Sequence, residues 1–367
     1  VDINPATLVI GGGIAGLSAA ITIADSGKQV YLIEKEKELG GQVANLDLTF
    51  PYLYSADQLI KPKIDKVLNH ENIEVFLNTT VDEIFGYIGN FEMTIATGKE
   101  KERELKFGNI IVATGLKTYD PYELDNYGFA KLPDVVSSID FESMLKAGKI
   151  LTSEGKEPRH VAIIHCVGSR NKDFKEYCSR VCCMTGLKYA NQVSSALPDS
   201  SVYEIYADMR AFGKGCEEFY EQTSKMNNIM FLMYDQQGEL PVISKARTKD
   251  KCQMLINMKE QLSGEDIEVP ADIVILMTAM ESHENAKEIA HAVGISMCGN
   301  EFYIEKHPKL DPVATTTDGV YIVGSCQGPK DITESISQAW AAASRVLATI
   351  AVGQVEVEVT TAKVNED

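Results

Sequence analysis

Short runs of apolar, often β-branched residues recur near the two ends of the chain, and they predict buried strands. Such runs occupy residues 6–10 (ATLVI), 29–33 (QVYLI) and 109–115 (NIIVATG), and another lies within 317–324. Between the first two, the pattern predicts a helix from about Ile14 to Ser26, which Gly27 stops. Alternation of strands and helices of this kind predicts an α/β fold with a parallel sheet.

The middle of the chain repeats the pattern and predicts a second α/β unit. Strands are expected at residues 161–165 (VAIIH), 201–206, 229–233, 254–258 and 273–277, with helices near 177–192 and 215–225. We therefore predict a first unit made of residues 1–117 and 281–352, with residues 118–280 inserted as a second unit. Residues 353–367 alternate Val with Glu and then turn polar, which indicates a frayed or partner-bound tail.

Composition narrows the classes of function. The chain has 367 residues, enough for two domains. Its formal net charge of −18 argues against nucleic acid and anionic membranes as partners. No run of about 18 apolar residues is present, so we expect no membrane insertion. The chain enters a strand without a secretory signal, and half of its eight cysteines cluster, so we expect reduced thiols and a cytoplasmic location.

The first predicted strand runs directly into a glycine-rich turn. Gly11, Gly13 and Gly16 form G-x-G-x-x-G, and Ile14 and Ala15 open the helix that follows. Glu34 ends the second strand, 18 positions after Gly16, where its carboxylate can accept a hydrogen bond from a ribose hydroxyl. Strand, glycines, helix and acid in this order predict a dinucleotide-binding βαβ unit. A plain tight turn between strand and helix is the alternative.

Three further features resemble those of FAD-containing flavoproteins. Glu34-Lys35 is followed by Leu39-Gly40-Gly41 and Gln42, the run at 109–115 ends in Ala113-Thr114-Gly115, and the late strand ends at Gly324-Ser325. We also place Val81 among the expected FAD contacts. In the second unit, the corresponding turn has no G-x-G-x-x-G, and Cys166 to Arg170 stands in its place. We therefore expect FAD and no bound nicotinamide.

Four cysteines lie within eighteen residues, and four thiolates are what an iron–sulfur cluster needs. They are Cys166, Cys178, Cys182 and Cys183. We expect Cys166 at the end of a strand, and Cys178 and Cys182 on one face of a helix, with the cluster against its first turn. Arg180 adds positive charge there, or is an ordinary solvated residue. A structural zinc site is an alternative, although the stretch has no CxxC, and so are cysteines that merely lie in the core. We predict a 4Fe–4S cluster.

The segment after the late strand predicts a helix beginning beside the flavin. Asp331 as N-cap and Glu334 three residues later form a capping box. We expect the N–H groups of Asp331 and Ile332 to stabilise negative charge on the flavin, and Lys330 to raise its potential. A solvated loop lysine is the alternative for Lys330. Other cysteines and a histidine are interpreted as structural or core residues, with roles in chemistry left open: Cys216, Cys252, Cys298, Cys326 and His165.

Five motifs together resemble the A subunit of heterodisulfide reductase. They are LVIGGGIAGLSAA, GGQVANLDLTFP, CVGSRNKDFKEYCSRVCCM, ADMRAFGKGCEEFYEQ and YIVGSCQGPKDITESISQA. The resemblance implies a two-dinucleotide-binding flavoprotein with a thioredoxin-reductase-like core and non-covalent FAD. It also implies one 4Fe–4S cluster held by Cys166, Cys178, Cys182 and Cys183, partner subunits in an electron-transfer complex, and a homodimer.

One departure from that family refines the prediction. Thr49-Phe50-Pro51 leads into Tyr52-Leu53-Tyr54, where many relatives have cysteines. The length and the single cysteine group resemble the short A subunit of the heterodisulfide-reductase-like complex of sulfur-oxidising prokaryotes. We therefore predict transfer of electrons between cluster and FAD in sulfur-compound oxidation. The alternatives are the A subunit of the quinone-interacting oxidoreductase of sulfate reducers, an NAD(P)H-dependent disulfide reductase, and a structural subunit with relic cofactors.

Overall fold

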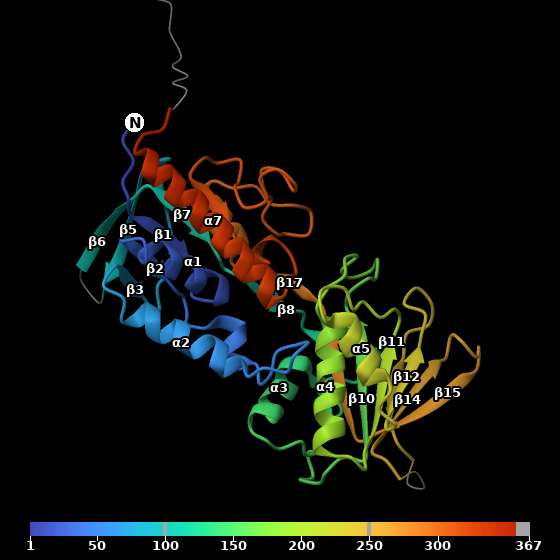
Figure 1. Ribbon diagram of the computed structural model, residues 1–367. Coiled ribbons are helices and arrows are strands. Elements are labelled where there is room, and N and C mark those ends of the chain that lie inside the picture. Colours follow the sequence, from blue (N-terminus) through green and yellow to red (C-terminus); the bar gives the residue numbers. More distant parts are fainter. Residues whose placement is uncertain (98–100, 248–250, 357–367) are drawn as a thin grey trace, which may run out of the picture.

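A five-stranded parallel sheet forms the centre of the first of two lobes (Figure 1). The computed structural model describes residues 1–97, 101–247 and 251–356. The strand order is β18-β7-β1-β2-β3. The strands are β1 (Thr7–Ile10), β2 (Val30–Ile33), β3 (Ile73–Phe76), β7 (Asn109–Val112) and β18 (Val320–Ile322). The strands predicted from the ends of the chain thus lie in one sheet.

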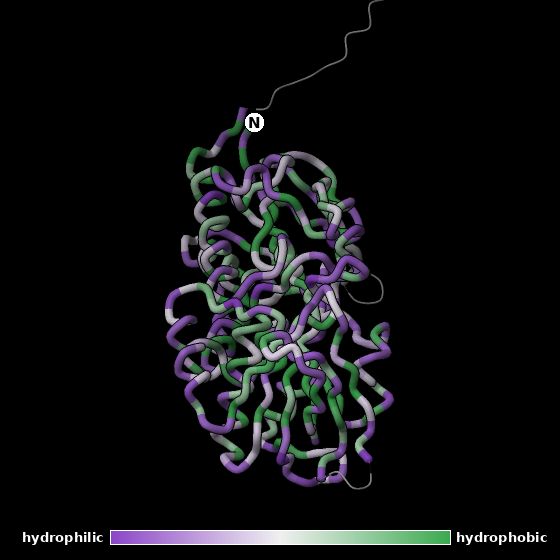
Figure 2. Tube along the Cα trace, turned by 90° about the vertical axis from the view of Figure 1, so that its right-hand side faces the viewer, coloured by the Kyte–Doolittle hydropathy of each residue, from purple (hydrophilic) through white to green (hydrophobic). Residues whose placement is uncertain are grey.

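Both faces of this sheet are covered, because successive side chains of a strand point to opposite faces. Val9 packs against helices α1 (Ile14–Ala24), α2 (Ala56–Leu68) and α7 (Ile332–Val352). Leu8 and Ile10 pack on the other side against α6 (Ala286–Val293) and a small antiparallel sheet. That sheet contains β4 (Phe85–Tyr87), β5 (Asn90–Thr97) and β6 (Lys101–Phe107). Figure 2 shows hydrophobic stretches inside the molecule and hydrophilic ones over its outer loops.

The second lobe is built around another five-stranded parallel sheet, in the order β12-β11-β10-β16-β9. Its strands are β9 (Val135–Ser137), β10 (His160–Val167), β11 (Ser201–Tyr206), β12 (Ile229–Met233) and β16 (Ile273–Thr278). Val161 and Ile163 pack against α3 (Ser138–Lys146) and α4 (Cys182–Ala196). α5 (Cys216–Ser224) packs against α4.

The strand predicted at 254–258 forms but does not join the parallel sheet. It is β14 (Met254–Lys259), the centre of an antiparallel sheet with β13 (Val242–Lys245) and β15 (Asp266–Ala271). This sheet covers the face of the lobe that carries Ala162 and Ile164. Apolar alternation predicts a buried strand, but it does not say which sheet the strand enters.

A two-stranded ribbon of β8 (Leu116–Thr118) and β17 (Met280–Ser282) lies between the lobes (Figure 1). Short 3₁₀ turns complete the described part of the chain: η1 (Gly41–Asn45), η2 (Pro121–Glu123), η3 (Asp125–Tyr127) and η4 (Gly324–Gln327). The domain limits predicted from the sequence stay a prediction. Most of the predicted tail, residues 357–367, lies outside the described residues. Within the described ranges, none of the helices is both long and apolar enough to cross a membrane.

The helix predicted from about Tyr177 begins later, at Cys182, so the placement of Cys178 on that helix is wrong. Arg180 has a left-handed backbone with φ of 61°, which a continuing right-handed helix does not allow. The Ser179 hydroxyl accepts a hydrogen bond from the Met280 N–H, and the Tyr177 hydroxyl donates to the Met280 carbonyl. These contacts with β17 hold Tyr177 and Ser179 outside the helix. The capping box of Asp331 and Glu334 is confirmed at the start of α7.

A buried ion pair fixes the second lobe against the first. Lys188 on α4 and Glu142 on α3 pair while both are almost completely buried. Lys188 also donates to the Leu48 carbonyl at 2.9 Å, and Glu142 accepts from the Asp47 N–H at 2.9 Å. Burial lowers the pKa of Lys188, whereas the charge of Glu142 opposes that shift. The pair thus binds the main chain of the first lobe from a site in the second.

We predict that Lys188→Met destabilises the protein by about 3–5 kcal/mol, because it leaves the Glu142 carboxylate buried without a counter-charge. Urea unfolding, followed by far-ultraviolet circular dichroism, measures the change. Lys146→Met is the matched control, since Lys146 pairs with Asp57 at a site where both side chains are about one third exposed, and its loss is expected to cost about 1 kcal/mol or less. Equal costs for the two variants would contradict the prediction.

Candidate functional site

The residues predicted to bind a dinucleotide converge on one edge of the first sheet. Because the five strands are parallel, their carboxyl ends meet at the same edge. Four of those ends carry predicted residues: Gly11, Gly13, Ile14, Ala15 and Gly16 after β1, Glu34 and Lys35 after β2, Ala113, Thr114 and Gly115 after β7, and Gly324 and Ser325 after β18. Val81 lies beyond β3 and is buried in the core of the lobe.

The turn between β1 and α1 has no room for a side chain at Gly11 or Gly16 but is open at Gly13. A Cβ on Gly16 would lie 1.9 Å from the Gly11 carbonyl oxygen, and one on Gly11 would lie 2.4 Å from the Ala113 oxygen. A Cβ on Gly13 would meet nothing closer than Gly41 Cα at 4.0 Å. No side chain of the described residues caps α1. Its first N–H groups therefore have no side-chain acceptor among the described residues, as pyrophosphate binding requires.

Glu34 is held next to the glycine turn. Its carboxylate oxygens accept from the Gly12 N–H at 2.6 Å and from the Glu36 N–H at 2.9 Å. The next residue, Lys35, lies with its Nζ 2.8 Å from Nε2 of His283. Burial and the charge of Lys35 lower the pKa of His283, so the neutral imidazole can accept a hydrogen bond from the ammonium group. Glu34 and Lys35 thus lie beside the glycine turn.

Two other predicted segments border this edge. Gly41 and Gln42 open η1, and a Cβ on Gly41 would lie 3.0 Å from Gly13 Cα. Gly324 has φ of 74°, and a Cβ there would lie 3.0 Å from Ala15 Cβ. The glycine turn, η1 and the end of β18 are therefore in direct contact. The structure brings together residues that are more than 300 positions apart in the sequence.

The start of α7 differs in part from the expectation. The Asp331 N–H donates to a Glu334 carboxylate oxygen at 3.1 Å, so the capping box already uses this donor. Ile332 is the first helical residue. Burial lowers the pKa of Lys330, which is partly buried beside Cys326. Lys330 is thus not a fully solvated loop lysine.

The structure places the four clustered cysteines near one another. Cys166 lies near the end of β10, Cys182 and Cys183 are the first residues of α4, and Cys178 lies in the loop before it. A hydrogen bond from Cys182 lowers the pKa of Cys183 to about 4 and raises that of Cys182. Burial, together with nearby Cys183, raises the pKa of Cys166 to about 11. Within the ranges described, no group of three or more His, Cys, Asp or Glu side chains has the geometry of a metal site.

The surroundings of these cysteines suit a negatively charged group. Arg170 Nη1 lies 3.9 Å from Cys166 Sγ, and the Arg180 N–H donates to Cys178 Sγ at 3.3 Å. Burial opposes the charge of Arg210, but Cys178 and Asp208 raise its pKa. Four neighbouring thiols, the guanidinium groups of Arg170 and Arg210 and a helix N-terminus suit the ligand number and the negative charge of a cubane iron–sulfur cluster. The cysteine block therefore fits such a cluster by its chemistry.

Arg180 connects the cysteine block to the edge that carries the dinucleotide residues. Its guanidinium donates to the Pro329 carbonyl at 2.9 Å and forms an ion pair with Glu334 at 2.6 Å. These two partners flank Lys330 and Asp331. Sequence reasoning left open whether Arg180 was a solvated helix residue. Its contacts with Pro329 and Glu334 join residues of different lobes, so they can be recognised only in the three-dimensional structure.

A second contact that the sequence does not reveal lies behind Cys183. His165 and Glu204 form a completely buried pair on neighbouring strands β10 and β11. Burial opposes the positive charge of His165, but Glu204 and Cys183 together raise the His165 pKa. Gly186 leaves the room for this ring, since a Cβ there would lie 2.4 Å from His165 Cε1. The histidine beside Cys166 is therefore a buried residue paired with Glu204.

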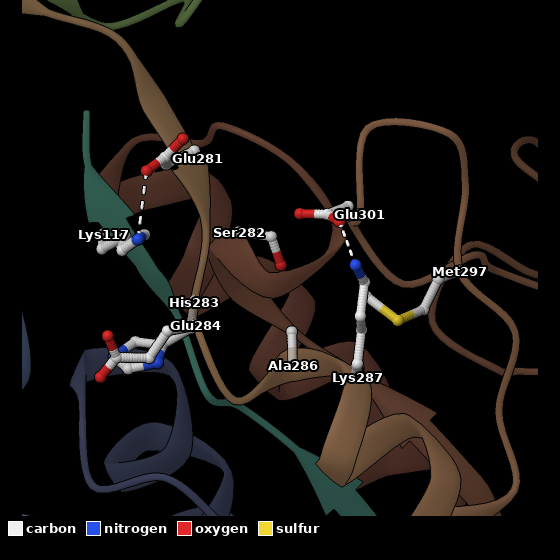
Figure 3. Close-up of a pocket in the computed structure, with 9 residues that line it drawn as sticks. All are labelled: Lys117, Glu281, Ser282, His283, Glu284, Ala286, Lys287, Met297 and Glu301. Atoms are coloured by element: carbon white, nitrogen blue, oxygen red, sulfur yellow. Dashed lines mark ion pairs between the residues drawn. The ribbon is translucent and has the colours of Figure 1, made fainter. Parts of the chain in front are cut away.

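A small polar cavity lies beside the ribbon between the lobes (Figure 3). It measures about 100 Å³ and is crossed by the ion pairs Lys117–Glu281 and Lys287–Glu301. Lys175, from the loop before Cys178, also pairs with Glu281 at 3.0 Å. Ligand pockets for molecules of drug size measure about 300–1,000 Å³. This cavity is therefore too small for a nicotinamide dinucleotide, and the Lys175–Glu281 pair beside it anchors the cysteine loop to the ribbon.

Comparison with known proteins decides the family. A family model described as "Pyridine nucleotide-disulphide oxidoreductase" matches residues 5–168. An iron-sulfur A subunit of the CoB–CoM heterodisulfide reductase of Methanopyrus kandleri is 34% identical, over all of this chain and 67% of its own length. The chain belongs to the family of heterodisulfide reductase A subunits. A protein of Archaeoglobus profundus that is named as like the heterodisulfide reductase A subunit is 28% identical, again over the whole chain and 69% of that protein.

Solved structures support the fold of this member of the heterodisulfide reductase family. Thioredoxin reductase of T. acidophilum matches 95% of the chain and 99% of its own length, with a TM-score of 0.62 at 18% identity. The predicted α/β fold of a thioredoxin-reductase-like, FAD-binding oxidoreductase is thereby confirmed. The chain spans about two thirds of the length of the curated relatives it matches.

We predict that Gly16→Ala abolishes FAD binding, because the new methyl group would lie 1.9 Å from the Gly11 oxygen and push α1 away from β1. Flavin absorbance per chain after gel filtration measures the effect. Gly299→Ala is the control, since no described atom lies within 4 Å of the added Cβ. Normal flavin content in Gly16→Ala would contradict the assigned site.

We also predict that Cys326 resists alkylation in the native protein at about pH 8, because a thiol with a raised pKa forms little thiolate. Burial raises its pKa to about 11, and its sulfur lies 3.1 Å from the Val323 carbonyl oxygen. Iodoacetamide labelling followed by peptide mass spectrometry measures the modified fraction. Guanidinium-unfolded protein is the positive control. Rapid labelling of native Cys326 would instead indicate a reactive redox thiol.

Proposed function

We propose that this chain is the electron-transfer subunit of a heterodisulfide-reductase-like complex, holding FAD at the edge of the first sheet and a 4Fe–4S cluster at the four cysteines. When bound, FAD exchanges electron pairs with partners and the cluster carries single electrons. The observation that carries this proposal is the contact of Arg180 with Pro329 and Glu334. It joins the cysteine loop to the first turn of α7, where the flavin is expected.

The chain's own residues perform four tasks in this proposal. The β1–α1 turn binds the pyrophosphate, and Glu34 binds the ribose. Cys166, Cys178, Cys182 and Cys183 supply the four sulfur ligands. Lys330 and the Ile332 N–H at the start of α7 place positive charge at the flavin edge. Arg170 and Arg210 offset part of the charge of four thiolates in a buried site, where unpaired charges are costly.

We place this activity in sulfur-compound oxidation, with the other subunits of the complex as partners, a homodimer as the oligomeric state and the cytoplasm as the location. The support is the segment after Pro51, which carries Tyr52, Leu53 and Tyr54. None of the chain's eight cysteines precedes Cys166, so this segment supplies no ligands for another cluster. That pattern resembles the complex of sulfur oxidisers more than the quinone-interacting oxidoreductase.

An NAD(P)H-dependent disulfide reductase is the rival function, because the matching family model is named for pyridine nucleotides. In the second lobe, the turn after β10 contains a single glycine, Gly168, and the side chain of Tyr119 occupies the space beside it. A Cβ on Gly168 would lie 2.6 Å from the Tyr119 ring. The first residues of α4 are Cys182 and Cys183. No pyrophosphate cradle like that of the first lobe is therefore formed among these described residues.

Metal analysis of the anaerobically purified chain tests the proposal. About four iron and four sulfide per chain, with a rhombic EPR signal after dithionite reduction, are expected. Zinc without sulfide would overturn the cluster assignment. In a separate anaerobic stopped-flow experiment, NADH or NADPH is expected to leave the flavin oxidised. Rapid bleaching of the flavin by either nucleotide would favour the rival function.

We predict that Cys182→Ser removes most of the iron and the EPR signal but leaves the FAD content unchanged. The cysteine block and the glycine turn lie in different lobes, so loss of one ligand leaves the flavin site intact. Iron, sulfide and flavin per chain are measured on the same sample. Cys298→Ser is the control, because Cys298 lies outside the cysteine block, in the segment that follows α6. Full iron content in Cys182→Ser would contradict its role as a ligand.

A further inference from the structure

The turn that presents Cys166 is held in an unusual backbone conformation. Cys166, Gly168 and Arg170 all have positive φ angles, of 60°, 74° and 56°. Gly168 adopts this conformation freely, but Cys166 and Arg170 carry side chains that disfavour it. Residues in such conformations persist only when their surroundings determine them. The surroundings of this turn therefore identify what holds Cys166 in place.

Besides hydrogen bonds within the backbone, the buried amide of Gln236 contacts this turn. Its Nε2 donates to the Ser169 carbonyl at 2.9 Å and to the Cys166 carbonyl at 3.3 Å. Its Oε1 accepts from the Tyr234 hydroxyl, which also lies 2.7 Å from the His165 carbonyl oxygen. Gln236 is 6% exposed and Tyr234 is fully buried. One side chain thus spans the turn from Cys166 to Ser169.

Only a primary amide satisfies all of these partners at once. Each carbonyl oxygen takes an N–H from the amide; the Cys166 oxygen also accepts from the Ser169 N–H at 3.0 Å, and the Tyr234 hydroxyl is shared between the amide oxygen and the His165 carbonyl. A carboxylate at position 236 would direct an oxygen at both carbonyls and would leave that of Ser169 without a donor. An apolar side chain would likewise leave the buried Ser169 carbonyl unsatisfied, which is costly. The chemistry of the site therefore explains why glutamine stands here.

We infer that Gln236, oriented by Tyr234, is a positioning residue that holds the Cys166 turn so that its sulfur faces the other three cysteines. This inference rests on the proposed cluster and extends it to two residues outside the cysteine block. Both come from the segment directly after β12, about 70 positions from Cys166. Gln236 touches the main chain and not the sulfur, so it acts through the backbone of the turn.

The neighbouring Gln237 provides a matched control. Its amide donates to the Arg170 carbonyl at 2.9 Å, one residue beyond the same turn, but the side chain is exposed. Water can replace a hydrogen bond at that position, whereas the Ser169 carbonyl lies beside a buried side chain and has no such replacement. A general effect of losing a glutamine in this segment would appear in both variants.

The test measures cluster loss from the anaerobic holoprotein. Iron release to a chelator, and the EPR spectrum after dithionite reduction, are compared for wild type, Gln236→Leu, Gln236→Glu and Gln237→Leu. We expect iron release about 10-fold or more faster in both Gln236 variants, with an altered EPR line shape, as for other residues that orient metal ligands. Gln237→Leu is expected to match wild type.

Wild-type release and line shape in folded Gln236→Leu would overturn the inference while the proposed function stands. A wild-type protein without iron and sulfide would overturn the proposed function, and this inference with it. If both Gln236 variants fail to fold, Tyr234→Phe decides, because it removes only the hydroxyl that orients the amide. Release faster than wild type, together with faster amide hydrogen exchange at residues 167–171, would then support the inference. An unchanged Tyr234→Phe protein would overturn it.

Discussion

Contact between Arg180 and the start of α7 determines how the two candidate sites relate to each other. The guanidinium binds Pro329 and Glu334, while the backbone N–H of the same residue binds Cys178. A single residue thus touches a sulfur of one lobe and the helix start of the other. The buried pair of Lys188 and Glu142 fixes the lobes at a second place. Two separate contacts resist rotation of one lobe against the other.

Arg180 has a left-handed backbone and lies outside the helix. This is why the helix predicted from Tyr177 was wrong at its start. Helical periodicity from Tyr177 onward predicts a helix, because propensity and pattern report only local preferences. Hydrogen bonds between Ser179, Tyr177 and Met280 override that preference, and they join residues about 100 positions apart. By contrast, the βαβ unit was predictable, because its turn, helix and acid all lie within residues 7–34 and their roles are set by local geometry.

Residues that act through buried polar contacts could not be found from the sequence. Gln236 and Tyr234 lie in an ordinary Tyr-Asp-Gln-Gln-Gly loop, and Glu204 occupies an inward position of a strand. The contribution of each residue can be recognised only in the three-dimensional structure, where a backbone carbonyl or an imidazole from another part of the chain accepts or shares its hydrogen bond. Cys166 was predictable as a strand-terminal cysteine, but its positive φ was not. The number and spacing of the cysteines predicted the cluster. The contacts of Gln236 and Tyr234 with the Cys166 turn, by contrast, are seen only in the tertiary structure.

The first turn of α4 differs from the first turn of α1 in the residues that surround it. In the first lobe, a glycine turn opens the space in front of α1, which suits a pyrophosphate. In the second lobe, the equivalent helix begins with Cys182 and Cys183, and Tyr119 packs against the only glycine of the preceding turn. A helix N-terminus can stabilise one anionic group at a time. Under the proposed function, the N-terminus of α4 serves the sulfur ligands of a cluster in the place where the first lobe has its pyrophosphate turn.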